Sequence, residues 1–104
     1  MKAYFFCDMK KVLNEQAIQE YRASVLATVE KHGGRYMVVG GEVRSVEGSR
    51  TFAFPVLIEF PSMQDALRWY HSPEYRPLRE LRLKATEGDA VFFSGPSQIP
   101  SSWD

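Results

Sequence analysis

The chain has 104 residues, 44% of them hydrophobic, and its 13 lysines and arginines balance 13 aspartates and glutamates. This length predicts one small domain with a thin core, and the zero net charge excludes the general attraction to phosphate backbones that non-specific nucleic-acid binding needs. One cysteine and two histidines give neither an intrachain disulfide nor metal-ligand spacing, so we expect no metal and no bound cofactor.

The first predicted element is a strand over residues 2–8, because this run is apolar, rich in aromatics and of strand length. It is shorter than the apolar region of a signal peptide, and no run in the sequence is long enough to cross a bilayer. We therefore expect a cytoplasmic protein without a membrane partner. A helix is predicted next, with Asn14 as N-cap and Gly33-Gly34 as its end. Its apolar stripe at helical spacing consists of Ile18, Tyr21, Val25 and Val29.

Two further strands are predicted in the middle of the chain. The apolar run 35–39 is typical of a buried strand, and residues 42–47 are expected to continue it irregularly. Residues 47–50 are predicted to form a turn. The next apolar run, 52–60, contains Pro55, which cannot donate a ladder hydrogen bond. That strand is expected to begin at an edge, at a bulge or only after Pro55.

Helix signals return at residue 62. Ser62 can cap a helix, and Asp65 can return the bond in a short capping box. Ser72 before a proline repeats the signal, which predicts a second helical piece over residues 73–86.

The end of the domain is marked by glycines. Gly88 is expected to end the second helical piece before a last strand over residues 90–93. We therefore predict one domain over residues 1–95 and a polar tail over residues 96–104.

The order of strand, helix, strand, strand, helix, strand predicts an α+β ferredoxin-like βαββαβ fold, with two helices on one face of a four-stranded antiparallel sheet. In a sheet with one solvent-exposed face, apolar and polar residues should alternate along each strand. In the predicted strands, however, residues that point to either face are apolar. The segments that show this are 4–6, 37–39, 56–58 and 91–93. Because one helical layer covers only one face, the sequence predicts a homodimer in which a second copy covers the other.

Three segments carry a family resemblance: residues 31–36 followed by Gly40-Gly41, the Ile-Glu-Phe-Pro-Ser segment 58–62, and the Trp-Tyr-His-Ser-Pro-Glu-Tyr segment 69–75. In order and spacing they resemble the bacterial domain-of-unknown-function 1330 family over nearly the whole chain. The resemblance implies a dimeric α/β-barrel, in which two ferredoxin-like protomers pack sheet against sheet. The wider superfamily includes cofactor-free monooxygenases, haem-degrading enzymes, lactone isomerases and ligand-binding domains, so the fold does not fix the function.

Three polar residues are candidates for a site. Arg35 opens a strand, where its guanidinium could hold a carboxylate ligand; the alternative is a surface cation. Glu59 is a candidate catalytic base if apolar neighbours raise its pKa; the alternative is exposure or an ion pair with an arginine. His71 lies at the break between two helical pieces, where it could act as acid or base; the alternative is a packed linker residue.

Aromatic residues complete the candidate site. Trp69, Tyr70 and Tyr75 are candidate ligand-binding residues, because one or two aromatic walls suit a flat ligand, although most aromatic side chains in a small domain belong to the core or to dimer contacts.

Together these residues predict a pocket between the sheet and the helices, with Arg35, Glu59, His71 and Tyr75 in its polar lining. The alternative is an Arg35–Glu59 ion pair with His71 at the surface. The predicted function is to bind or transform a small aromatic or carboxylated molecule without a cofactor. The alternative is a non-catalytic ligand-binding or stress-associated module, and the sequence does not decide whether the protein is an enzyme.

Overall fold

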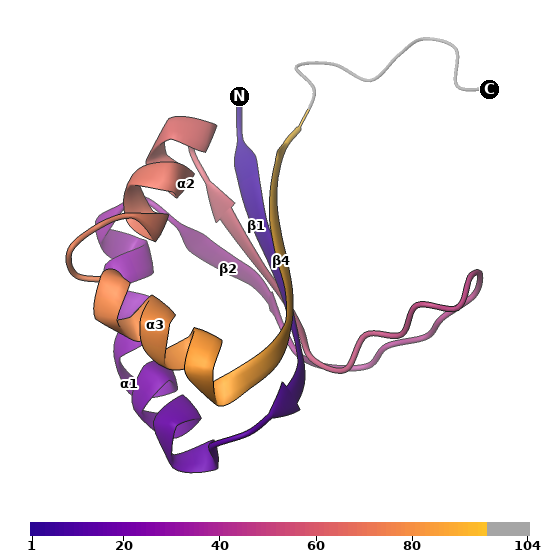
Figure 1. Cartoon of the computed structure of the whole chain (residues 1–104). Helices are drawn as coiled ribbons and strands as arrows, with labels where there is room; N and C mark the ends of the chain where they lie inside the picture. Colours follow the sequence, from indigo (N-terminus) through magenta and orange to yellow (C-terminus); the bar gives the residue numbers. More distant parts are fainter. Residues whose placement is uncertain (96–104) are drawn as a thin grey trace, which may run out of the picture.

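The computed structural model describes residues 1–95, and the predicted tail over 96–104 lies outside them. Among the described residues, no helix is long and apolar enough to cross a membrane. The elements in chain order are β1 (Ala3–Val12), α1 (Glu15–Lys31), β2 (Arg35–Val39), β3 (Pro55–Phe60), α2 (Met63–Tyr70), α3 (Arg76–Ala85) and β4 (Thr86–Ser94). The strands form an antiparallel sheet in the order β2-β3-β1-β4, with the helices on one face (Figure 1). The predicted α+β ferredoxin-like fold is confirmed.

Capping residues place the starts of α1 and α2 as predicted. Asn14 Oδ1 accepts a hydrogen bond from the backbone N–H of Ala17 at 3.1 Å. Ser62 Oγ accepts one from the backbone N–H of Asp65 at 3.0 Å and donates to the Asp65 carboxylate at 2.9 Å. Each cap is worth about 1 kcal/mol, because it satisfies an N–H group that has no partner inside the helix. After α1, Gly33 adopts a φ of 77°, a left-handed conformation that suits glycine.

The third helix starts later than predicted. Residues 73–75 form a turn, and α3 begins at Arg76 with Pro77 in its first turn, where the missing proline N–H costs no hydrogen bond. Ser72 caps the turn, since its Oγ accepts a hydrogen bond from the backbone N–H of Tyr75 at 3.2 Å. The prediction of a helix over residues 73–86 is therefore wrong in its first turn.

Gly88 lies inside β4, so the prediction that it ends the helix is wrong. The helix ends at Ala85, and the chain enters β4 at once. The register between β1 and β4 shifts between Met9 and Lys11, and Gly88 pairs with Met9 at this bulge. A Cβ on Gly88 would collide with the backbone carbonyl of Asp8. The close approach of the two strands therefore requires glycine at this position.

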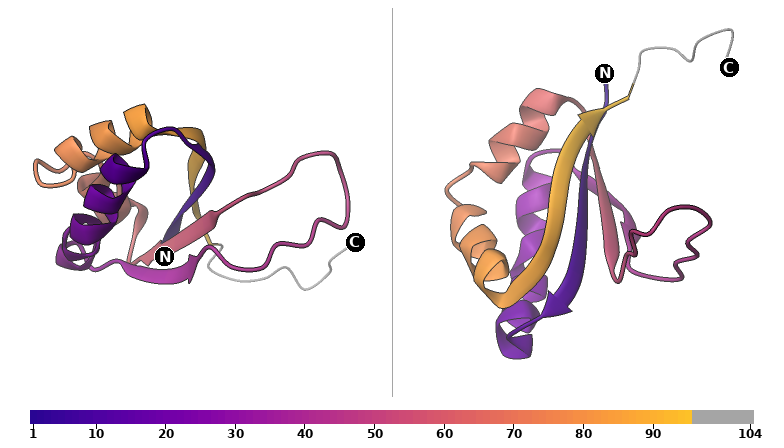
Figure 2. Two further views of the ribbon diagram at one scale, coloured as in Figure 1. Left: turned by 90° about the horizontal axis from the view of Figure 1, so that it is seen from below. Right: turned by 45° about the vertical axis from the view of Figure 1, so that its right-hand side comes forward.

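Residues 40–54 connect β2 to β3 as an arm without helix or strand, on the side of the sheet away from the helices (Figure 2). The predicted irregular strand over residues 42–47 is therefore wrong. Gly40, with a φ of 68°, turns the chain out of the ladder, and its N–H donates to the carbonyl of Pro55 at 2.7 Å. Pro55 is the first residue of β3, which agrees with the prediction that proline delays the start of this strand.

The two faces of the sheet differ in how they are covered. The inner face packs against the helices, and Phe5 and Ile58 on it are each 2% exposed. The other face is also apolar, and it carries Tyr4, Phe6, Leu57, Val91 and Phe93 at paired positions of three strands. Val91 is 51% exposed and Phe93 is 47% exposed. The single chain thus has the apolar second face that the strand pattern predicts, and within residues 1–95 no helix covers it.

Candidate ligand-binding cavity

A cavity of about 470 Å³ lies between the sheet and helices α1 and α3. Its apolar wall includes Phe5, Met9, Val25, Leu26, Val56 and Ile58. The other lining groups include Cys7 from β1, Tyr21 and Arg22 from α1, Tyr36 from β2 and Arg82 from α3. A mostly apolar cavity with a few polar groups has the usual composition of a small-molecule site.

Arg82 is the buried charge in this wall, with 6% of the residue exposed. Its Nε donates to the Tyr75 hydroxyl at 3.4 Å, and its Nη1 donates to Cys7 Sγ at 3.7 Å. Within residues 1–95, its Nη2 has no hydrogen-bond partner and no carboxylate forms an ion pair with it. The guanidinium also lies 5.9 Å from the centre of the Phe5 ring. Arg82 is therefore a buried cation without a compensating anion.

The other polar groups around Arg82 are neutral at physiological pH. Tyr21 and Tyr75 share a hydrogen bond of 2.8 Å between their hydroxyls. Burial raises the pKa of Tyr21 well above its ordinary value, and it raises the pKa of Tyr36 to about 12. Burial also raises the pKa of the Cys7 thiol, although Arg82 acts in the opposite direction. The polar wall therefore combines one positive charge with uncharged hydroxyl and thiol groups.

This combination suits binding of a negative group more than acid–base chemistry. A guanidinium and nearby hydroxyls are hydrogen-bond donors for a carboxylate or an enolate. The described lining contains neither a carboxylate nor a histidine, and the tyrosines with raised pKa values hold their protons at neutral pH.

The structure places Arg35 and Glu59 away from this cavity. They are cross-strand partners, and Arg35 Nη2 lies 3.3 Å from Glu59 Oε1. Glu59 pairs with Tyr4 on the open face of the sheet, accepts a hydrogen bond from its hydroxyl at 3.3 Å, and lies 3.2 Å from Lys2 Nζ. The hydrogen bond from Lys2, aided by the charges of Lys2 and Arg35, lowers the pKa of Glu59. In the single chain the pKa of Glu59 is therefore lowered, and the ion-pair alternative describes its contact with Arg35. The role of Glu59 as a catalytic base stays a prediction.

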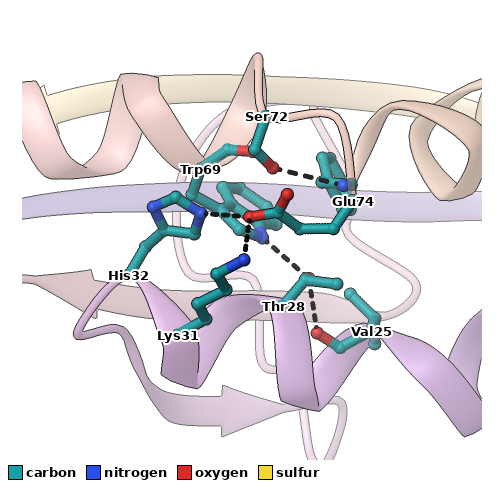
Figure 3. A network of polar contacts seen from close by, with 8 residues as sticks. Val25, Thr28, Lys31, His32, Trp69, Ser72 and Glu74 are labelled. Atoms are coloured by element: carbon teal, nitrogen blue, oxygen red, sulfur yellow. Dashed lines mark hydrogen bonds and ion pairs between the residues drawn. The ribbon is translucent and has the colours of Figure 1, made fainter.

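The three predicted aromatic residues belong to the core behind the cavity. Trp69 and Tyr75 are fully buried and lie 4.1 Å apart between ring centres, and Tyr70 lies 6.0 Å from Tyr75. Trp69 Nε1 donates to Thr28 Oγ1 at 3.0 Å (Figure 3). The Tyr75 hydroxyl contacts Tyr21 and Arg82 in the polar wall, and its ring lies edge-on to that of Tyr21. None of the three lines the cavity.

His71 is exposed and also lies outside the cavity lining. Its Nδ1 is 3.5 Å from Arg79 Nη1, and its backbone N–H caps α2 by donating to the carbonyl of Leu67 at 3.0 Å. The other histidine, His32, lies 2.9 Å from the carboxylate of Glu74 (Figure 3). The predicted convergence of four polar side chains in this cavity is therefore wrong. The roles of His71 in catalysis and of the aromatic residues in binding stay predictions, without support from the cavity.

Sequence reasoning missed Arg82, which has the strongest site geometry. The segment around it is rich in arginine and lysine, which suggests a solvated helix face. A weak signal was present, because Arg82 falls at helical spacing with Leu78 and Ala85, both of which pack in or against the core. An arginine on the apolar stripe of a helix indicates a buried charge that needs a partner.

Fold, open apolar face and cavity together define a small α+β protein of the ferredoxin-like class with a built-in pocket. The chain belongs to the family described as "Domain of unknown function (DUF1330)", whose model matches residues 2–96. This confirms the resemblance seen in the sequence. No curated protein matches the sequence significantly.

Solved structures with the same fold have little sequence in common with this chain. The RPA0582 protein of unknown function from Rhodopseudomonas palustris has a TM-score of 0.71 at 14% identity, over 93% of this chain and 84% of that one. A dimeric ferredoxin-like protein of unknown function from Jannaschia sp. CCS1 has a TM-score of 0.73 at 10% identity, over 91% and 100%. A variant of SnoaB, a cofactor-independent oxygenase from Streptomyces nogalater, has a TM-score of 0.66 at 12% identity, over 96% and 98%. At these identities the likeness shows the fold alone.

Proposed function

We propose that this protein is a homodimer that binds a small, mostly apolar molecule in the cavity between its sheet and helices, without needing a cofactor. The observation that carries the proposal is the cavity itself, whose volume of about 470 Å³ and apolar wall are typical of a small-molecule site. The polar groups around Arg82 would orient the ligand. A cytoplasmic location fits this proposal.

The homodimer is supported by the open face of the sheet. Val91 and Phe93 are about half exposed there, beside Tyr4 and Phe6, although large apolar side chains at paired positions favour burial. Two solved structures with this fold are described as dimeric. A second copy placed sheet against sheet should bury more than roughly 1,200 Å² in total.

Two readings of the cavity differ in chemistry. The likeness in fold to SnoaB, which is described as a cofactor-independent oxygenase, is in favour of an enzyme of that kind. The polar wall supports a non-catalytic binding module, because the lining described for this cavity has no group that can take a proton at neutral pH. Glu59 and His71 would serve an enzyme only at a second site outside this cavity. We therefore favour binding as the function of the cavity itself.

The test uses the neutral fluorescent dye N-phenyl-1-naphthylamine as a probe of the cavity. The wild-type protein should bind it with a rise in fluorescence. Val25→Phe, which fills the cavity from α1, should abolish the rise, whereas Leu83→Phe on the exposed side of α3 should not. Circular dichroism checks that both variants fold. Absent binding, or binding that survives Val25→Phe, would contradict the proposed function.

A further inference from the structure

We propose, building on the proposed function, that the ligand is an organic monoanion, with an apolar body and one acidic group that binds at Arg82. The inference goes beyond a general pocket because it assigns the charge of the ligand and the residue that recognises it. Arg82 is 6% exposed, lines the cavity and has an unpartnered Nη2.

The burial of Arg82 is energetically costly in the ligand-free protein. A buried cation without a partner loses the hydration of its charge and gains no ion pair in return. The contacts of Arg82 are a hydroxyl oxygen at 3.4 Å, a sulfur at 3.7 Å and an aromatic ring, and none of these carries a negative charge at neutral pH. A bound anion would supply the missing partner, so the cavity should prefer an anion over a neutral molecule of the same shape.

The hydroxyl groups beside Arg82 can supply a second hydrogen-bond donor. A guanidinium can only donate, so the Tyr75 oxygen accepts from Arg82 Nε. The hydroxyl oxygens of Tyr75 and Tyr21 lie 2.8 Å apart, and either hydroxyl can be the donor. When an acidic group enters the cavity, Tyr75 can donate to Tyr21, which leaves the proton of Tyr21 for that group. Arg82 and Tyr21 would then present two donors to the same acidic group.

Arg82 differs in its surroundings from Arg22, the other arginine in the lining. Arg22 Nη1 lies 3.6 Å from the carboxylate of Glu15, and its guanidinium lies 5.7 Å from the centre of the Phe54 ring. Its side chain is 48% exposed, so water and Glu15 already compensate its charge. Arg22 therefore has less to gain from an anionic ligand than Arg82, and the two lining arginines can be compared directly.

The experiment compares two dyes that differ only by a sulfonate: 8-anilino-1-naphthalenesulfonate, which is an anion, and N-phenyl-1-naphthylamine, which is neutral. Dissociation constants are measured by fluorescence titration for the wild type, Arg82→Met, Arg82→Lys and Arg22→Met. The wild type should bind the anionic dye on the order of tenfold more tightly than the neutral one. Arg82→Met should lose this preference and keep its affinity for the neutral dye. Arg82→Lys should retain part of the preference, and Arg22→Met should reduce it far less than Arg82→Met does.

The outcomes distinguish the two proposals. Equal affinities of the wild type for both dyes, or an unchanged preference for the anionic dye in Arg82→Met, would overturn the monoanion proposal. The proposed small-molecule pocket would not be affected by either result. If neither dye binds, the proposed function fails and the assignment of Arg82 fails with it. If Arg82→Met no longer binds the neutral dye but keeps its melting temperature, the proposal is also overturned. Arg82 would then shape the cavity without recognising the charge of the ligand.

Discussion

Arg82→Met should leave the ligand-free protein as stable as the wild type, or make it more stable. The substitution removes hydrogen bonds of 3.4 Å and 3.7 Å to Tyr75 and Cys7, and a 5.9 Å contact with the Phe5 ring. These weak contacts together are worth about 2 kcal/mol. The same change removes the desolvation penalty of a buried cation without a carboxylate, which is several kcal/mol. The balance predicts a free energy of unfolding between unchanged and about 3 kcal/mol higher.

The assay is thermal unfolding followed by circular dichroism, without ligand and at one fixed protein concentration, because the melting temperature of the proposed dimer would depend on concentration. In a domain of this size each 1 kcal/mol shifts the melting temperature by roughly 5 °C. Arg22→Met, at a half-exposed ion pair, should change the free energy of unfolding by no more than about 0.5 kcal/mol. A melting temperature lowered by more than about 5 °C in Arg82→Met would refute the reasoning. In that case the contacts of Arg82 would stabilise the fold by more free energy than the desolvation of its charge costs.

Three other predictions concern the sheet. Phe93→Asp places a charge on the open face and should make the protein monomeric in sedimentation velocity at micromolar concentration. The control Leu83→Asp, on the exposed side of α3, should stay dimeric. If Phe93→Asp is dimeric, this face is not the interface. Gly88→Ala forces a Cβ against the carbonyl of Asp8 and should lower the free energy of unfolding, measured in urea, by about 1–3 kcal/mol. An unchanged urea midpoint of unfolding would contradict the described bulge. The pKa of Glu59 is lowered in the folded state, so its stabilising contribution is present above its unfolded pKa of about 4.3 and is lost as the pH falls through the folded value. Glu59→Gln should therefore lose less stability on acidification than the wild type, and identical acid profiles would count against this assignment.

The features that could be predicted from the sequence depend on neighbouring residues. Asn14 and Ser62 cap helices because the N–H groups that they satisfy lie three residues away along the chain. Pro55 limits its strand through its own missing N–H. The two-sided apolar pattern of the strands also depends only on alternation along each strand, and it correctly predicts a sheet with a second apolar face.

The features that could not be predicted depend on register between distant segments. Gly88 is required by the carbonyl of Asp8, eighty positions earlier, and only the β1–β4 pairing brings them together. Arg35 and Glu59 are adjacent because β2 and β3 pair in one particular register. A shift of one residue in the strand pairing would turn the Glu59 carboxylate toward the helices. The residues next to Glu59 in the sequence therefore do not determine whether it lines the cavity or forms a surface ion pair.

The alternation of side chains along β1 also explains how one strand contributes to two surfaces. In β1, Phe5 and Cys7 face the cavity, whereas Tyr4 and Phe6 face the open side of the sheet. A ligand in the cavity and a second copy on the open face would therefore contact the same strand from opposite sides. Because β1 is central and pairs with both β3 and β4, its position is fixed by the sheet and does not depend on either contact. The cavity can thus be formed within one chain, and a second copy would act on it by covering the apolar side chains behind its floor.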